Sequence, residues 1–82
     1  MKLRDILKDV KILDLNVSLD EEVADITGDS RKVSKDSAFI CLEGTKFDGH
    51  LYTKDAINAG AKILITQKEM KFLNSEKFVR IE

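Results

Sequence analysis

Residues 38–42 read Ala-Phe-Ile-Cys-Leu, a continuous apolar run between the polar stretches Lys35-Asp36-Ser37 and Glu43-Gly44-Thr45. The run is too short for a typical helix but long enough for a strand that is covered on both faces. Strands of this kind belong in the interior of parallel or mixed sheets that are flanked by helices. We therefore expect 38–42 to be the central strand of a small, open, mixed or parallel α/β sheet.

Two helices are predicted, one before and one after this strand in the sequence. Leu3, Ile6, Leu7 and Val10 recur at helical spacing, which predicts an amphipathic helix over residues 2–10. A second helix is predicted over residues 50–59, with Asp48 as its N-cap and Gly60 as its terminating residue. The expected buried face of this second helix consists of Tyr52, Ala56, Ile57 and Ala59.

Four further segments have strand patterns, at residues 11–16, 22–27, 61–66 and 78–81. A short helix or turn over 67–75 is expected to cross between the last two strands. The mixed charges of this stretch, which begins Gln67-Lys68-Glu69, predict a solvated surface. Strands that alternate with helices and a crossover predict a single α/β domain over residues 1–82.

The composition narrows the classes of function. With 14 Lys and Arg against 15 Asp and Glu, the net charge of −1 gives no general attraction to nucleic acid. No apolar run approaches the roughly 20 residues that span a bilayer, and no signal core follows Met1, so we expect a cytoplasmic chain with no membrane partner. Cys41 is the only cysteine, which excludes an internal disulfide and a four-thiolate metal site.

Three polar clusters surround the predicted central strand. One precedes it, and two follow it in the loop that leads to the second helix. Ligands of open α/β sheets bind beyond the carboxyl ends of the strands, where this loop begins. The clusters are Gly28-Asp29-Ser30-Arg31, Gly44-Thr45-Lys46-Phe47 and Asp48-Gly49-His50.

The order and spacing of these clusters resemble the N-terminal domain of the Mur ligases, which build the peptide of bacterial peptidoglycan. The likeness covers residues 26–66, with a weaker likeness in the opening Met1-Lys2-Leu3. The chain departs from the family at Lys35-Asp36-Ser37, where a Pro-Gly-Asp turn is usual. It also lacks the phosphate loop Gly-x-x-x-x-Gly-Lys-Ser/Thr of the family's ATP-binding domain. The matching residues are Asp29-Ser30-Arg31-Lys32-Val33, Phe39, Gly44, Asp48-Gly49-His50, Ala56 and Gly60-Ala61.

Within the family, the chain looks most like the ligase that acts on UDP-N-acetylmuramoyl-L-alanyl-D-glutamate and adds the third stem-peptide residue. The resemblance implies a UDP-binding domain without catalytic residues or a cofactor of its own. The parent enzyme would supply ATP, magnesium and the remaining domains. Two alternatives stay open: the corresponding domain of the ligase that adds the terminal dipeptide, and a free-standing domain that binds another protein. A dinucleotide-binding enzyme is strongly disfavoured, because no Gly-x-Gly-x-x-Gly follows a strand.

The resemblance also implies which residues bind the UDP end of the substrate. Gly28 and Ser30 would lie beside the uridine, and Thr45, Lys46 and Phe47 would line the nucleotide from the other side. A serine hydroxyl both donates and accepts hydrogen bonds, which suits the edge of uracil. The alternatives are that Ser30 only caps a turn and that Phe47 only covers the core.

The remaining polar residues are predicted to support the site. Asp29 and Arg31 are expected to pair and to fix their loop. Asp48, Gly49 and His50 are expected to shape the helix start, with His50 as a capping or packing residue. No second histidine, cysteine or convergent carboxylate accompanies His50, so we predict no metal site. Cys41 is expected to be a small buried hydrophobe without a chemical role.

Overall fold

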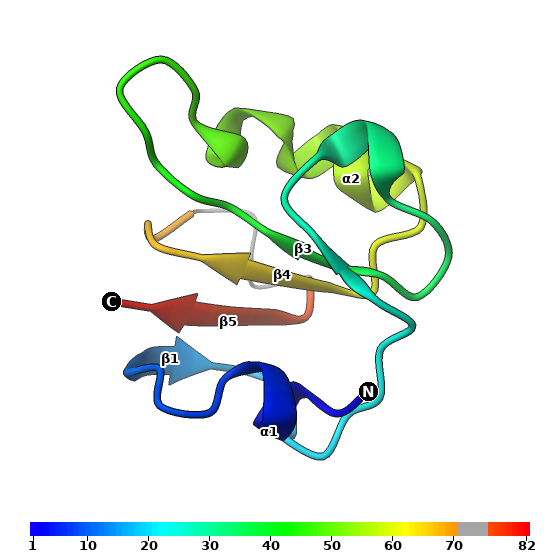
Figure 1. Ribbon diagram of the computed structural model, residues 1–82, viewed down its shortest axis with the longest axis vertical. Helices are drawn as coiled ribbons and strands as arrows, with labels where there is room; N and C mark the ends of the chain where they lie inside the picture. Colours follow the sequence, from blue (N-terminus) through cyan, green and yellow to red (C-terminus); the bar gives the residue numbers. More distant parts are fainter. Residues whose placement is uncertain (71–75) are drawn as a thin grey trace.

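The computed structural model describes residues 1–70 and 76–82 and contains a five-stranded mixed sheet in the order β1-β5-β4-β3-β2 (Figure 1). Neighbouring strands from β2 to β5 run parallel, and β1 runs antiparallel to β5. This confirms the predicted α/β sheet. The strands are β1 (Ile12–Leu15), β2 (Ile26–Thr27), β3 (Ala38–Ile40), β4 (Ile63–Thr66) and β5 (Phe78–Ile81).

The central strand is β4, not β3, so the prediction for 38–42 is wrong in this respect. β3 lies one place away, hydrogen-bonded between β2 and β4. All four residues of β4 are buried, so both of its faces are covered. The mostly apolar run 61–66 is thus also typical of a strand covered on both faces, as 38–42 is, so sequence pattern did not distinguish which of the two is central. The apolar run 38–42 extends past the end of β3 at Ile40, and its last residue, Leu42, is half exposed.

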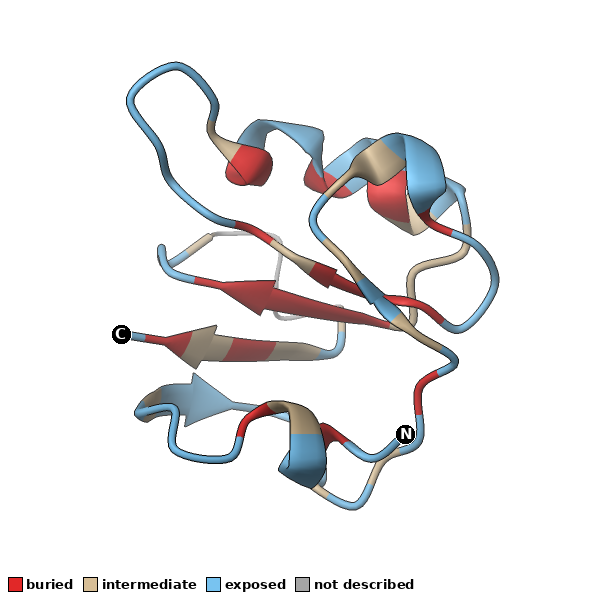
Figure 2. Ribbon diagram, viewed as in Figure 1, coloured by how far each residue is buried: buried red, intermediate tan, exposed pale blue. Residues whose placement is uncertain are grey.

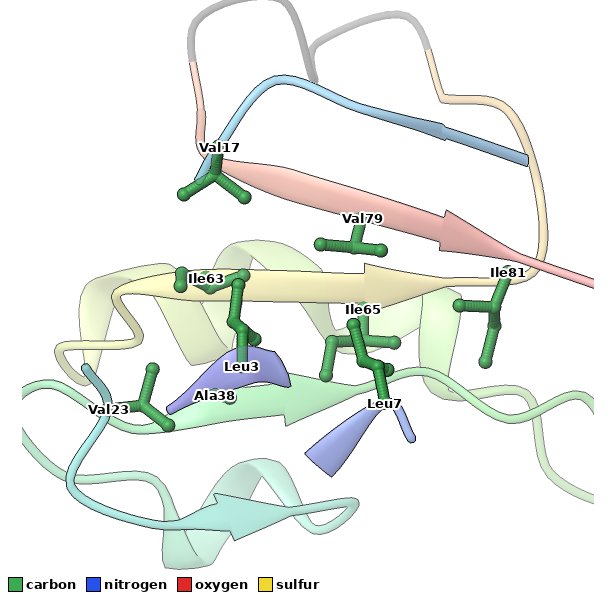
Figure 3. Close-up of a cluster of buried hydrophobic side chains, with 9 residues drawn as sticks. All are labelled: Leu3, Leu7, Val17, Val23, Ala38, Ile63, Ile65, Val79 and Ile81. Carbon is green, nitrogen blue, oxygen red and sulfur yellow. The ribbon is translucent and has the colours of Figure 1, made fainter. Parts of the chain in front are cut away.

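One face of the sheet is covered by α1 (Leu3–Ile6). Figure 3 shows Leu3 and Leu7 pointing from this segment onto Ile63 and Ile65 of β4. Successive strand residues point to opposite faces, so Leu64 faces away from this cluster. The buried cluster on this face consists of Leu3, Leu7, Val17, Val23, Ala38, Ile63, Ile65, Val79 and Ile81.

The opposite face is covered by α2 (Thr53–Asn58), which lies on the other side of the sheet from α1 (Figures 1 and 2). Ala56 of α2 packs with Phe39 of β3 and Leu64 of β4, and Phe39 is fully buried. Burying a phenylalanine or leucine side chain contributes about 1.5–3 kcal/mol. This second cluster holds α2 over β3 and β4, and so positions the loops at the ends of those strands.

Both helices are shorter than predicted. The chain leaves α1 at Leu7, and Asp9 has a left-handed backbone with φ of 65°, which turns it toward β1. Val10 is therefore 37% exposed instead of buried. The predicted strand 22–27 is likewise reduced to β2, because Val23 turns into the core cluster under α1.

The second helix begins as a 3₁₀ turn, η2 (Gly49–Tyr52), before α2. A 3₁₀ turn has 3.0 residues per turn instead of 3.6, so it shifts which residues face the sheet. Thr53 and Ala56 are buried, whereas Tyr52 and Ala59 are exposed. The predicted buried face was therefore wrong for Tyr52 and Ala59. Within the predicted crossover 67–75, residues 67–70 are irregular, and 71–75 lie outside the described residues.

A tight turn stands where the family pattern has Pro-Gly-Asp. The Ser37 amide donates to the Ser34 carbonyl at 3.2 Å, and Asp36 takes the left-handed conformation with φ of 69°. Aspartate tolerates this conformation better than most residues. Gly60, with φ of 112°, packs against the turn so closely that a Cβ would lie 2.9 Å from the Lys35 Cα. The expected helix end at Gly60 is thus confirmed, and the glycine is also required by this contact.

Candidate ligand-binding pocket

A pocket of about 620 Å³ lies beyond the carboxyl ends of β2 and β3, a size typical of small-molecule sites. Gly28 follows β2 directly, and the loop after β3 contributes Phe47. The two strands are parallel, with Thr27 paired to Phe39, so the segments that follow them leave the same edge of the sheet. The lining residues are Gly28, Asp29, Ser30, Arg31, Phe47, Tyr52 and Asp55.

One wall is the short 3₁₀ helix η1 (Ser30–Lys32), which Asp29 caps by accepting the Arg31 amide at 2.9 Å. The Arg31 guanidinium returns to Asp29 with Nε 3.0 Å from Oδ1 and Nη2 2.9 Å from Oδ2. These contacts with Arg31 lower the pKa of Asp29 from its ordinary value of 3.8 to about 2. They confirm that the two residues form a structural pair. Ser30 also lines the pocket, and its Oγ makes no hydrogen bond to another described residue.

The other wall is aromatic. The rings of Phe47 and Tyr52 stack with centroids 5.3 Å apart and planes 16° apart. Both residues line the pocket, and Phe47 is 50% and Tyr52 38% exposed. Stacked aromatic pairs gain about 0.5–1.5 kcal/mol beyond the area they bury. The contact therefore helps to hold Phe47, which belongs to an otherwise exposed loop, against η2.

His50 anchors the base of this wall. The Asp48 carboxylate accepts the His50 amide at 2.9 Å, as expected of the predicted N-cap. The buried imidazole lies with Nδ1 2.6 Å from Asp48 Oδ1, and its Nε2 accepts the backbone amides of Gln67 and Lys68 at 3.0 and 3.2 Å. An acceptor at Nε2 assigns the ring proton to Nδ1. His50 is thus a packing and capping residue, as predicted.

Lys68 completes this network, here called the anchor, whose residues are Glu43, Asp48, His50, Gln67 and Lys68. The part that Lys68 and Gln67 take in it was not predicted from the sequence. The Lys68 Nζ contacts Asp48 Oδ2 and lies 2.7 Å from Glu43 Oε2, while the Gln67 side chain accepts the Glu43 amide at 3.0 Å. Contact with Lys68, followed by that with His50, holds the pKa of Asp48 well below its ordinary value. Lys68 is exposed together with Gln67 and Glu69, so the predicted solvated surface is confirmed for these residues, and Lys68 forms the ion pairs from that surface. The segment after β4 ties down both ends of the loop between β3 and η2.

Gly49 and Cys41 meet beneath this anchor. A Cβ on Gly49 would lie 3.0 Å from the Cys41 Cα, so the close approach of the two backbones requires glycine. Cys41 is fully buried, and burial, with a smaller contribution from Asp48, raises the pKa of its thiol to about 12. This confirms Cys41 as a buried hydrophobe.

The pocket brings together some of the predicted site residues and leaves others out. Gly28, Ser30 and Phe47 line it, with Asp29 and Arg31. Thr45 and Lys46 lie in the exposed part of the loop and do not line it. Tyr52 and Asp55 line it but were not predicted as site residues. Their spacing of i and i+3 after the Asp48 cap is the signal that could have placed them on one side of the helix.

No helix among residues 1–70 and 76–82 is long and apolar enough to cross a membrane. In the same part of the chain, no group of three or more His, Cys, Asp and Glu side chains is arranged to hold a metal ion.

The chain matches the family model described as Mur ligase family, catalytic domain, over residues 22–77. It is 40% identical over 70 residues to the UDP-N-acetylmuramoyl-L-alanyl-D-glutamate–2,6-diaminopimelate ligase of Clostridioides difficile, covering 85% of this chain and 14% of that protein. The protein of the same name from Alkaliphilus metalliredigens is 35% identical over 82 residues, covering 100% of this chain and 17% of that protein. The chain thus spans only a small part of these relatives.

Solved structures of similar fold also occur. The MurF ligase of Thermotoga maritima, determined in complex with ADP, superposes with a TM-score of 0.61 at 26% identity, covering 70% of this chain and 13% of that one. A MurF structure from Acinetobacter baumannii gives a TM-score of 0.67 at 19% identity, covering 96% of this chain and 16% of that one. The latter likeness concerns the fold alone.

Proposed function

The chain belongs to the Mur ligase family, and on this premise we propose that residues 1–82 form a domain that holds the UDP end of a UDP-N-acetylmuramoyl-peptide. The relatives at 31–40% identity are named for ligation of 2,6-diaminopimelate to UDP-N-acetylmuramoyl-L-alanyl-D-glutamate. The substrate proposed for this chain is therefore that nucleotide-linked dipeptide. The enzyme to which the domain contributes would extend the peptide by its third residue during peptidoglycan synthesis.

The observation that carries the proposal is the pocket between the two loops. Gly28 and Ser30 follow β2, Phe47 follows β3, and the fold brings them around one hollow at the carboxyl edge of the sheet. Their meeting in space supports a shared ligand.

The chemistry of the pocket suits a uridine better than a free phosphate. The Ser30 hydroxyl can donate to a uracil carbonyl or accept from the ring N–H. The Phe47 and Tyr52 rings offer an apolar wall to a flat base. Because Arg31 is engaged by Asp29, the diphosphate is assigned in this proposal to the exposed loop outside the pocket, near Thr45 and Lys46.

The ATP and magnesium chemistry of a ligase is not assigned to this chain. The sequence contains no phosphate-binding loop of the Gly-x-x-x-x-Gly-Lys-Ser/Thr type. The residues that the structure describes contain no carboxylate or histidine cluster suited to a metal. In this proposal the chain only binds and orients the remote end of the substrate, so that binding energy helps to position the reacting carboxylate elsewhere.

Two other functions have less support. The MurF role rests on solved structures at 19–26% identity, whereas the relatives named for diaminopimelate ligation reach 40%. A free-standing interaction domain would leave the pocket, and its agreement with the family pattern, without a purpose.

The test is a titration of the ¹⁵N-labelled chain with UDP and with ADP, followed by backbone amide shifts. We expect UDP to change the amide chemical shifts of Gly28, Ser30 and residues 45–47. ADP should leave the amide shifts of Gly28 and Ser30 unchanged. Equal shifts with both nucleotides would mean that the site recognises the diphosphate and not the uracil base. The absence of any shift with UDP would overturn the proposal.

Ser30→Ala tests the role of the hydroxyl. Loss of one neutral hydrogen bond weakens binding by about 0.5–1.5 kcal/mol, so the Kd for UDP should rise severalfold. Ser18→Ala is the control, because Ser18 is exposed and does not line the pocket. An unchanged Kd in Ser30→Ala would make Ser30 a turn residue only.

A further inference from the structure

We propose that Asp55 recognises the ribose of the bound nucleotide by accepting hydrogen bonds from its two neighbouring hydroxyls. This inference rests on the proposed function, because it takes a ribonucleotide to be the ligand of the pocket. It adds a residue that the family resemblance did not supply, since the sequence pattern assigned no role to position 55.

The fold places Asp55 on the ligand side of its helix. Thr53 and Ala56 are buried against the sheet, whereas Tyr52 and Asp55 are exposed. Residues three apart in a helix lie on the same side, and both of these residues line the pocket. The hydrogen bonds of His50 fix the start of this segment, so the backbone at Asp55 is held on the side of the pocket.

The charge balance of the pocket selects the part of the nucleotide that enters it. Its charged lining groups are Asp29, Arg31 and Asp55, and the first two neutralise one another through a bidentate contact. Among the described residues, no cation lies within ion-pair distance of Asp55. The pocket therefore has one uncompensated negative charge. Like charges repel more strongly as water is excluded, so the anionic diphosphate is disfavoured there and the neutral nucleoside is favoured.

Within the nucleoside, the ribose is the better partner for a carboxylate. An ionised carboxylate only accepts hydrogen bonds. The edge of uracil presents a single N–H between two carbonyl oxygens, which would both repel an approaching carboxylate. The ribose presents two adjacent hydroxyl donors that match the two oxygens of one carboxylate. Carboxylates recognise ribose hydroxyls in this way in other nucleotide-binding folds.

The experiment compares UDP with 2′-deoxy-UDP, which lacks one of the two hydroxyls but keeps the base and diphosphate. Kd values are measured by amide shift titration for the wild-type chain and for Asp55→Ala. A hydrogen bond to a charged group is worth about tenfold or more in affinity. We expect the wild type to bind UDP about tenfold more tightly than 2′-deoxy-UDP, and Asp55→Ala to bind the two equally.

Asp5→Ala is the matched control. Asp5 is an exposed aspartate on α1, across the sheet from the pocket, and its removal changes the net charge equally. This variant should keep the wild-type preference. If UDP binds but the wild type does not distinguish the two nucleotides, or if Asp55→Ala retains the preference, the ribose contact is wrong while the proposed function stands. Failure of the wild type to bind UDP overturns both.

Discussion

The Nδ1 of His50 donates to the carboxylate of Asp48 across 2.6 Å, and this hydrogen bond closes a small network beneath the pocket. The other ring nitrogen of His50 receives two backbone amides from residues that follow β4. The network thus joins the start of η2 to the end of a neighbouring strand. It therefore anchors the segment that carries Tyr52 of the aromatic wall to the sheet.

Replacing His50 by alanine should destabilise the chain by about 2–4 kcal/mol, because it removes a buried ring and leaves buried partners without hydrogen bonds. Urea unfolding followed by circular dichroism measures this change. Lys54→Ala is the control: Lys54 is exposed on α2, so its replacement should alter stability by less than about 0.5 kcal/mol. A His50→Ala variant as stable as this control would contradict the anchoring role.

Stability should decrease in acid. Asp29 and Asp48 both have lowered pKa values in the folded chain, through Arg31 and Lys68 respectively, and that of Asp29 is about 2. A carboxyl whose pKa is lowered by folding stabilises the fold fully at pH values above its pKa in the unfolded chain. This contribution is lost as the pH falls to the pKa of the group in the folded chain. The urea midpoint should therefore fall mainly between about pH 4 and pH 2. Asp48→Asn should show a shallower fall, and a slope equal to that of the wild type would remove Asp48 from the explanation.

Gly60→Ala should destabilise the chain by about 2 kcal/mol or more. The backbone at this position has φ of 112°, and the added methyl would meet the Lys35 backbone at 2.9 Å. For a domain of this size, the melting temperature should fall by roughly 8 °C or more. Gly28→Ala serves as the comparison, because a Cβ there meets its nearest neighbour at an ordinary 3.6 Å. Equal losses in the two variants would show that the turn contact is not the cause.

Cys41 should resist thiol reagents in the native chain. Its thiol is fully buried and its pKa is raised to about 12, so almost no thiolate is present at neutral or mildly alkaline pH. Labelling with a thiol-specific reagent should be slow in buffer and fast in urea. Fast labelling of the folded chain would mean that the strand end at Cys41 opens far more readily than its packing indicates.

The parts of the fold that could be predicted from the sequence are those governed by local pattern. The apolar runs that became β3 and β4, the alternation of β5 and the Asp48 cap each have a signal within a few residues. The strand order has no such signal, because it depends on which strands pair across the whole chain. The shortened helices were missed for a related reason. Asp9 and the 3₁₀ turn at Gly49–Tyr52 interrupt the helical geometry, and neither predicted helix, 2–10 or 50–59, contains a proline or glycine that marks the break.

The site was predictable to the extent that its residues are contiguous in sequence. The pair Asp29 and Arg31 could be inferred from spacing alone, and its geometry is confirmed. Lys68 and Gln67 could not be assigned to the anchor, because they reach Asp48 and Glu43 only through the pairing of β3 with β4. Asp55 was missed because its position in the pocket depends on the phase of a helix that begins with a 3₁₀ turn.

The place of β5 in the sheet has a consequence for how the chain is made. Among the strands that the structure describes, β5 is synthesised last, yet it lies between β1, the first, and β4. While the chain is being synthesised, β1 has no partner, and the apolar residues of α1 have only part of their core, which includes Val79 and Ile81. These contacts therefore form only after β5 has been synthesised, and they join segments that are distant in sequence.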